Sequence, residues 1–130
     1  MSELPKAGAL LFAKDLERMA SFYEQVAGLA VKARAEGRIV LESAHYSLVL
    51  HALPQIVADN LTITSPPMRR TDVPVKLIFP VPSLALVHTL SPMLGGGVDS
   101  ESAEWIGPGF RACEGFDPEG NLVQWREPLA

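Results

Sequence analysis

The sequence has little of what several large classes of protein require. Cys113 is its only cysteine, which excludes an internal disulfide framework and a zinc cluster built from several thiolates. The 11 basic residues are scattered, and only Arg69 and Arg70 are adjacent, so no basic stripe is present to neutralise a phosphate backbone. No stretch approaches the ~18 consecutive apolar residues that a membrane span needs. We therefore expect neither nucleic acid nor a membrane as a partner.

What remains is the composition of an ordinary compact domain. The chain has 130 residues, of which 48% are hydrophobic and 20% charged, and this length suits a single domain over residues 1–130. The first six residues carry Glu3 and Pro5 where a secretory signal needs a basic and then an apolar run. We therefore expect a cytoplasmic protein.

The first half of the chain has the pattern of one strand, one helix and three further strands. Residues 9–13 form a short apolar run typical of a buried strand, and Asp15 after it is a suitable helix N-cap. Apolar residues then recur at spacings of three and four as far as Gly28, which predicts an amphipathic helix. Three strands are predicted after the helix, at residues 29–34, 38–42 and 46–51.

The second half repeats this βαβββ order. An apolar strand at residues 75–81 precedes a helix capped by Ser83, and three further strands are predicted at residues 98–105, 110–115 and 121–126. The proline-rich segment between the halves has no sustained period and is predicted to be a linker. The predicted boundaries are about 7–52 for module one, 53–74 for the linker and 75–128 for module two.

Two motifs at this separation carry a family resemblance. Residues 12–16 read Phe-Ala-Lys-Asp-Leu, and residues 116–122 read Phe-Asp-Pro-Glu-Gly-Asn-Leu, just before the last strand. The chain thereby resembles the vicinal oxygen chelate superfamily, which includes glyoxalase I, bleomycin-resistance proteins and extradiol dioxygenases. The resemblance implies an α+β fold in which two tandem βαβββ modules form a curved mixed sheet around a concave cup. It also implies a homodimer, which is common in this group.

In the metal-using members, the first and last strand of each module supply the ligands of a divalent ion. Family spacing places the first of these positions at Gly8, which has no side chain to offer, and the corresponding position of module two at Lys76 or Val75. None of these residues is a metal ligand. Since catalytic metal sites usually have three protein ligands, we predict no cofactor and no conventional metal site in the cup.

The last strands of the modules supply the remaining candidates. In module one the family position falls on Leu50 or, with a shift of one residue, on His51, and only one of the two can face the cup. In module two it falls on Gln124, a polar amide in an otherwise half-buried strand that needs a partner. If a metal binds, His51 and Gln124 are its candidate ligands, together with Glu114.

Other residues are candidates for contacting a ligand. Trp105 precedes a glycine-rich turn at residues 107–109 that can cover the mouth of the cup, and Phe12 can line the same space. The strand at residues 110–115 directs into the cup either Arg111 and Cys113 or Ala112 and Glu114. An inward Arg111 would bind an anionic group. An inward Glu114 would be a candidate catalytic base, with its pKa raised by an apolar wall.

Two further residues are assigned no chemistry. Cys113 has no neighbouring histidine in the sequence to lower its pKa, so it is not expected to act as a nucleophile. His88 lies in the second helix and is expected to be solvated.

The hypothesis that follows is a glyoxalase/bleomycin-resistance-type protein, dimeric, that binds a small molecule in its cup without a conventional metal site. One alternative is a divalent-metal-dependent lyase or dioxygenase whose metal site is completed by the substrate. Another is a non-catalytic interaction module. The fold alone does not separate them, because this superfamily hosts several chemistries and binders.

Overall fold

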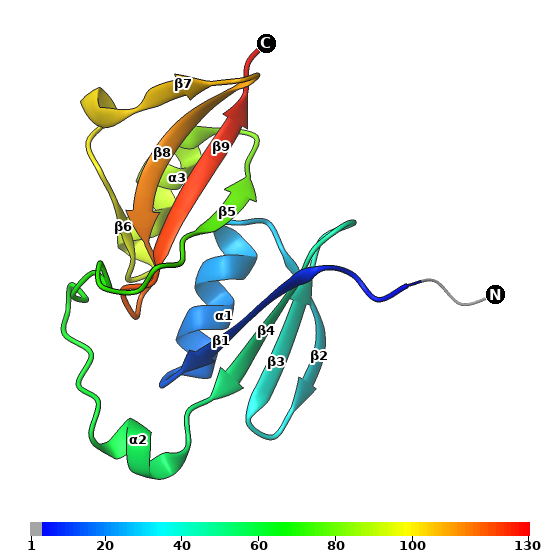
Figure 1. Cartoon of the computed structure of the whole chain (residues 1–130), viewed down its shortest axis with the longest axis vertical. Helices are drawn as coiled ribbons and strands as arrows, with labels where there is room; N and C mark the ends of the chain where they lie inside the picture. The colour runs from blue at the N-terminus through cyan, green and yellow to red at the C-terminus, as the bar shows by residue number, and fades with distance from the viewer. Residues whose placement is uncertain (1–3) are drawn as a thin grey trace.

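The computed structural model describes residues 4–130 of the chain. Its first module is a four-stranded sheet with one helix against it (Figure 1). The elements are β1 (Gly8–Ala13), α1 (Leu16–Gln25), β2 (Ala30–Ala35), β3 (Arg38–Glu42) and β4 (Ser47–Ala52). The strand order is β1-β4-β3-β2, with β1 parallel to β4 and the other pairs antiparallel. This confirms the predicted βαβββ unit.

The second module repeats the arrangement with strand order β5-β9-β8-β6, and β7 also pairs with β8. As in module one, its first and last strands are parallel. No helix in the described part of the chain combines the length and apolarity needed to cross a membrane. The elements from the linker onward are α2 (Gln55–Asp59), β5 (Leu77–Pro80), α3 (Leu84–Met93), β6 (Gly97–Val98), the 3-10 turn η1 (Glu101–Ala103), β7 (Trp105–Gly107), β8 (Phe110–Phe116) and β9 (Leu122–Pro128).

The prediction of one continuous strand at residues 98–105 is wrong, because this segment forms two short strands with an interruption between them. β6 pairs with the end of β8 and β7 pairs with its start, and η1 lies between them. The residues of η1 are exposed and do not alternate in polarity, so no face of this stretch is driven into the core. The interruption places Trp105 at the start of its own short strand.

The two modules share one hydrophobic core, and α1 lies between the two sheets in Figure 1. The ring of Phe22 on α1 is 6.0 Å from that of Trp125 on β9, and the ring of Tyr23 is 5.4 Å from that of Phe79 on β5. Tyr46 of module one also contacts Phe79, at 5.4 Å. These aromatic side chains are large, so their contacts across the boundary account for much of the apolar surface that holds the modules together.

A buried carboxylate also joins the modules. Asp117 follows β8, is fully buried, and accepts a hydrogen bond of 2.6 Å from the Tyr23 hydroxyl of α1. It also accepts bonds from the backbone N–H groups of Glu119 and Asn121, and from the Asn121 amide, at 2.8–3.0 Å. Every one of these contacts is made by a donor, which offsets part of the cost of burial, although burial still raises the pKa of Asp117 above its usual value.

The neighbouring Glu119 caps the first helix. Its carboxylate accepts bonds of 2.8–2.9 Å from the backbone N–H groups of Lys14 and Asp15, immediately before α1, and the Asp15 side chain accepts from the Arg18 N–H. The two motifs that carry the family resemblance therefore bind each other, and their separation in sequence reflects a contact between modules.

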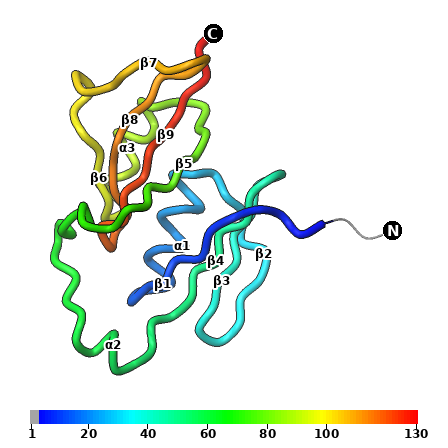
Figure 2. Tube along the Cα trace, viewed as in Figure 1, coloured from blue at the N-terminus to red at the C-terminus, as the bar shows by residue number. Residues whose placement is uncertain are grey.

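The second half of the linker is attached to module two. Backbone and side chain of Arg70 donate to the carbonyl groups of Gly120 and Glu119, at 2.9 and 3.0 Å. Arg69 forms an ion pair of 2.6 Å with Asp99. The first half contains α2, which has no buried residue, and forms the long excursion at the lower left of Figure 2.

Candidate functional site

One face of each sheet packs on the helices and the other is open. In β4, Leu48 and Leu50 are fully buried on the helix side, whereas Val49 and His51 lie on the open face. His51 pairs in register with Phe12 of β1, and their rings meet edge to face at 5.6 Å. The one-residue ambiguity of the sequence is thereby resolved, and Leu50 belongs to the core.

The open face of the second sheet carries Gln124. It pairs in register with Glu114 of β8, so the two side chains share a face, and they are joined by a hydrogen bond of 3.0 Å. Trp125 is completely buried on the helix side. Of the two alternatives for the strand at residues 110–115, the structure has Ala112 and Glu114 on the open face.

Arg111 therefore lies elsewhere than expected for a cup residue. It is on the helix side of β8, with its guanidinium 3.9 Å from the Glu104 carboxylate. The strand alternation that carries Glu114 to the open face carries Arg111 away from it, so the structure does not bring Arg111 together with Gln124.

Glu114 is the centre of a polar network on this face, called here the Glu114 network. Its carboxylate accepts hydrogen bonds from the Lys76 ammonium at 2.5 Å and from the Trp105 indole N–H at 3.1 Å, besides the one from Gln124. The Gln124 carbonyl oxygen in turn accepts from the Arg126 guanidinium at 2.7 Å. The network thus contains two cations, Lys76 and Arg126, and one carboxylate, Glu114. The Gln124 amide bridges Glu114 and Arg126.

The pKa of Glu114 departs from the expectation. Burial alone would raise this pKa, but hydrogen bonds from Lys76, Trp105 and Gln124 outweigh it and hold the pKa below its usual range. The predicted apolar wall is therefore wrong, because the carboxyl group sits among donors. A carboxylate held in this way is a weak base and a good acceptor, which favours a binding role over proton abstraction.

The depressed pKa predicts how the network responds to acid. Because the folded-state pKa of Glu114 lies below the ordinary value of 4.5, its contribution to stability is present above pH 4.5 and is lost as the pH falls through the folded-state pKa. A carbon-13 NMR titration of the glutamate carboxyl groups should give a Glu114 midpoint below 4.5. Lys76→Met should shift that midpoint upward. A midpoint at or above 4.5 in the unsubstituted protein would contradict the network.

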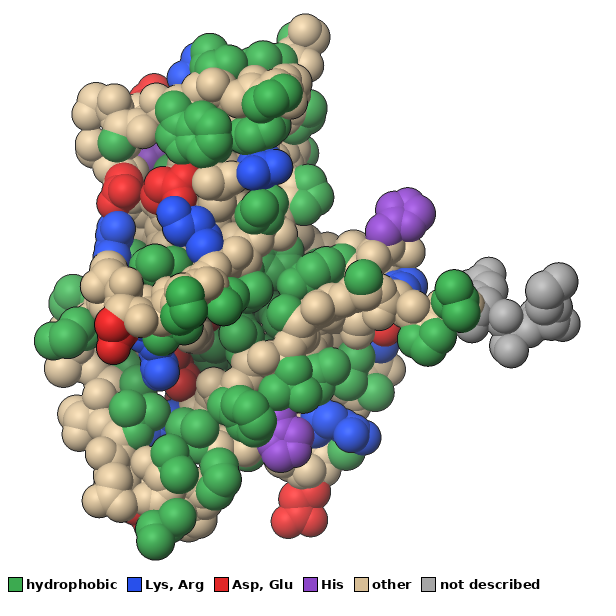
Figure 3. All heavy atoms as spheres, in the orientation of Figure 1, with side chains coloured by type: hydrophobic (Ala, Val, Ile, Leu, Met, Phe, Trp, Pro, Cys, Tyr) green, Lys and Arg blue, Asp and Glu red, His purple; other side chains and the backbone are tan. Residues whose placement is uncertain are grey.

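Exposed apolar side chains lie on the open faces of both sheets. Leu10 and Phe12 of β1, Ile78 of β5 and Trp105 of β7 are 41% to 54% exposed, which is high for residues of this size. Figure 3 shows this side of the molecule, with hydrophobic atoms spread over both modules and acidic and basic side chains next to one another among them. A cavity of about 300 Å³ lies between β1 and module two and is lined by Leu10, Phe12, Val75 and Leu122, among others.

The positions at which the resemblance implies metal ligands do not fit a divalent ion. A Cβ atom at position 8 would overlap the carbonyl oxygen of Ser47, so only glycine is accommodated there. The Lys76 ammonium forms an ion pair with the Glu114 carboxylate, which a metal ion would need as a ligand. The ammonium and the metal ion would therefore compete for Glu114. His51 lies on the first sheet, with its Nδ1 atom 2.9 Å from the Ala52 carbonyl oxygen.

Sequence reasoning missed a contact on the helix side of module two. His88 of α3 was expected to be solvated, but its Nε2 atom lies 2.7 Å from the Glu104 carboxylate and 3.8 Å from the Cys113 sulfur. The three residues are far apart in the chain, so no local pattern signals the contact. Burial raises the pKa of the Cys113 thiol to about 12, and nearby carboxylates add to this effect, so the free thiol is not a nucleophile at neutral pH.

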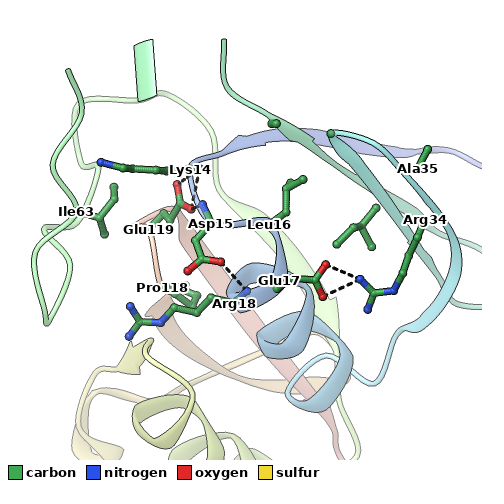
Figure 4. A pocket seen from close by; sticks show the side chains of 13 residues that line it. Lys14, Asp15, Leu16, Glu17, Arg18, Arg34, Ala35, Ile63, Pro118 and Glu119 are labelled. Carbon is green, nitrogen blue, oxygen red and sulfur yellow. Dashed lines mark hydrogen bonds and ion pairs between the residues drawn. The ribbon is translucent and has the colours of Figure 1, made fainter. Parts of the chain in front are cut away.

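A second cavity, of about 720 Å³, lies at the start of α1 (Figure 4). Its acidic side chains are already engaged within the fold. Glu119 caps the backbone at Lys14 and Asp15, and both carboxylate oxygens of Glu17 accept from Arg34 at 2.6–2.7 Å. This cavity therefore offers a ligand fewer unengaged acidic groups than its size suggests. The Glu114 network is taken as the candidate site because it lies on the open sheet face, where the resemblance implies the ligand site.

Comparison with known proteins defines the class of fold. No profile of a known protein family and no curated protein matches the sequence. Among solved structures, a glyoxalase/bleomycin resistance protein/dioxygenase family enzyme from Burkholderia phytofirmans PsJN is similar, with a TM-score of 0.65 and 20% identity over 95% of this chain and 98% of that one. A glyoxalase/bleomycin resistance protein from Albidiferax ferrireducens T118 gives 0.66 and 17%, over 95% and 98%. The bleomycin resistance determinant encoded on transposon Tn5 gives 0.60 and 18%, over 98% and 100%.

These similarities extend over nearly the whole chain, so the fold is that of the glyoxalase/bleomycin-resistance/dioxygenase proteins. The fold that the resemblance implied, with two βαβββ modules, is thereby confirmed. At this level of identity the site residues must be interpreted from their own chemistry.

Proposed function

We propose that the protein binds a small organic molecule against the open face of its second sheet, without a metal ion at that site. The observation that carries the proposal is the Glu114 network, an organised set of polar groups beside exposed apolar side chains. Ligand sites typically combine apolar walls with a few fixed polar groups. Since Lys76 and Arg126 outnumber Glu114, the ligand class that fits is a flat molecule with an acidic or strongly accepting group.

The aromatic groups suit a flat ligand. Trp105 is 41% exposed, and its indole is fixed at one end by the bond to Glu114, so its ring can stack on a ligand without losing much conformational freedom. The Arg126 guanidinium is similarly held over the ring of Phe110, at 4.1 Å. Binding to preorganised side chains costs less ordering entropy.

We further propose that a second copy of the chain covers the open faces. Large apolar side chains gather on both sheets, and contiguous apolar surface of this kind is typical of an interface. A second copy would remove this surface from water and enclose the ligand. The protein would then be a homodimer in solution, with a mass of about twice 14.1 kDa.

Phe12 provides the test of this arrangement. Phe12→Glu should convert the dimer to a monomer, because it places a charge in the centre of the proposed interface, while thermal stability of the monomer changes little since Phe12 is outside the core. Light scattering coupled to size exclusion measures the mass. Leu86→Glu is the matched control, since Leu86 is similarly exposed, at 53%, but lies on α3. A monomeric unsubstituted protein, or equal effects of the two variants, would contradict the proposal.

A divalent-metal-dependent lyase or dioxygenase remains the alternative with a specific observation behind it. Glu114 and Gln124 place two oxygen-bearing side chains on one face, which is the start of a metal site. The Lys76 ammonium on Glu114 and the placement of His51 on the other sheet weigh against it. Elemental analysis of protein expressed with manganese, iron, nickel and zinc would favour this alternative if metal were lost on Glu114→Gln.

The binding proposal itself is tested by the two tryptophans of the chain. In a nitrogen-15 NMR spectrum, a library of flat acidic fragments should shift the indole signal of Trp105, which belongs to the site. The indole signal of Trp125 should stay in place, since it is completely buried on the other side of the sheet. Fragments that shift neither signal, or that shift only Trp125, would overturn the assignment of the site. The interaction-module alternative predicts the first of these results.

A further inference from the structure

The His88, Glu104 and Cys113 cluster lies on the opposite side of the second sheet from the Glu114 network. Its three ligand atoms, the His88 imidazole nitrogen, a Glu104 carboxylate oxygen and the Cys113 sulfur, all lie within 4.8 Å of one another. They come from three separate parts of module two: α3, the residue before β7, and the middle of β8. A helix, the end of η1 and a strand therefore converge on one point.

The cluster is protected from water but remains accessible. Cys113 is 1% exposed and the Glu104 side chain 7%, whereas the His88 side chain is 26% exposed. A cavity of about 530 Å³ lies alongside, lined by His88 and Glu104 and further by Glu101, Arg111 and Glu127. Solvent can thus reach the imidazole side of the cluster, where a fourth ligand would stand.

These donors match one class of metal ion. A thiolate and an imidazole are borderline-soft ligands that favour zinc over magnesium, calcium or manganese, and zinc also accepts a carboxylate oxygen. Tetrahedral coordination at usual bond lengths would separate sulfur from nitrogen by about 3.6 Å and nitrogen from oxygen by about 3.4 Å. The corresponding separations here are 3.8 Å and 2.7 Å, so the His88 to Glu104 contact has to open by less than about 1 Å, and the sulfur lies within 4.8 Å of the carboxylate oxygen.

We propose that His88, Glu104 and Cys113 form a Zn²⁺ site of three protein ligands, with water as the fourth. Thiolate and carboxylate together neutralise the charge of the ion, and the ion displaces the thiol proton on binding. Arg111 lies 3.9 Å from the other oxygen of Glu104 and would hold the carboxylate in place from outside. The site is independent of the ligand-binding proposal and of the positions at which the family resemblance implies a metal.

The position of the site gives it a structural consequence. Glu104 directly precedes Trp105, and Cys113 directly precedes Glu114, so two zinc ligands are chain neighbours of two members of the Glu114 network. β7 is a three-residue strand that, within residues 4–130, pairs only with β8, and a metal would tie its start to α3 and to the middle of β8. Zinc would thereby hold the strand that carries the exposed indole of Trp105.

The test uses the metal-free full-length chain and Zn²⁺ itself. Competition with a chromophoric chelator should give one Zn²⁺ per chain, and Co²⁺ in its place should give a thiolate-to-metal charge-transfer absorption. Removal of one of three ligands by Cys113→Ala, His88→Gln or Glu104→Gln should weaken Zn²⁺ binding by about 100-fold or more. Cys113→Ala should also abolish the charge-transfer absorption, and a variant that merely misfolds is recognised by its circular dichroism without metal.

Two controls make the result specific. His45→Gln removes an exposed histidine of module one and should leave the Zn²⁺ affinity unchanged. Glu114→Gln distinguishes the two faces of the sheet, since it acts only on an ion bound at the open face. Failure to bind one Zn²⁺ per chain, or binding that survives Cys113→Ala but is lost in Glu114→Gln, would overturn the proposal. Retention of Zn²⁺ by Glu114→Gln with loss in Cys113→Ala would support it.

Discussion

Asp117→Ala should destabilise the protein by about 3–5 kcal/mol, the largest effect we expect from a single substitution outside the apolar core. The carboxylate is fully buried and accepts four hydrogen bonds, from the Tyr23 hydroxyl, two backbone N–H groups and the Asn121 amide. Alanine would leave these donors without a partner in a site closed to water, and an unsatisfied buried group costs more than the bond it lost. Urea unfolding monitored by circular dichroism measures the change.

Tyr23→Phe is the matched control for this substitution. It removes one hydroxyl and keeps the ring that packs on Phe79, so Asp117 retains its three other donors. The expected loss is about 1–2 kcal/mol. A loss below about 1 kcal/mol in Asp117→Ala would mean that water replaces the carboxylate and that the contact does not hold the modules together.

The contact between the two motifs that Asp117 and Glu119 make is one reason why the fold could be predicted from the sequence. The motif at residues 12–16 and the motif at residues 116–122 are distant in the chain, but Glu119 and Asp117 of the second bind the backbone and helix that the first one starts. Apolar periodicity gave the order of elements, and helix caps at Asp15 and Ser83 marked the starts of α1 and α3, whereas the short helix α2 within the linker was not predicted. These signals are local, so they can be recognised without the tertiary structure.

The candidate site was harder to predict from the sequence than the fold. It depends on which face of a strand each side chain occupies and on which residues that side chain contacts. A strand pattern gives alternation but not its phase, so Arg111 and Glu114 were equal candidates until the pairing of β8 with β9 settled them. The pKa of Glu114 depends on Lys76, the residue before β5 and a partner 38 residues away in sequence. His88 and Cys113 meet only because α3 packs on β8, and that packing has no local signature.

Gln124→Leu should weaken binding of a fragment that shifts the Trp105 signal by about tenfold to hundredfold, because it removes a fixed donor and acceptor from the centre of the Glu114 network. Stability should change by only about 1 kcal/mol, since leucine fills a similar volume and Glu114 keeps its bonds to Lys76 and Trp105. Fragment affinity by NMR titration and unfolding in urea separate the two effects.

The control is Gln25→Leu, which makes the same chemical change at an exposed position near the end of α1 and should alter neither quantity. The balance between affinity and stability then decides what Gln124 does. A residue that only bridges Glu114 and Arg126 for structural reasons would lose stability when replaced and leave fragment affinity intact. Loss of affinity with the fold retained would mean that the amide contacts the ligand. The polar groups of the open face would then be arranged for binding rather than for holding β8 to β9.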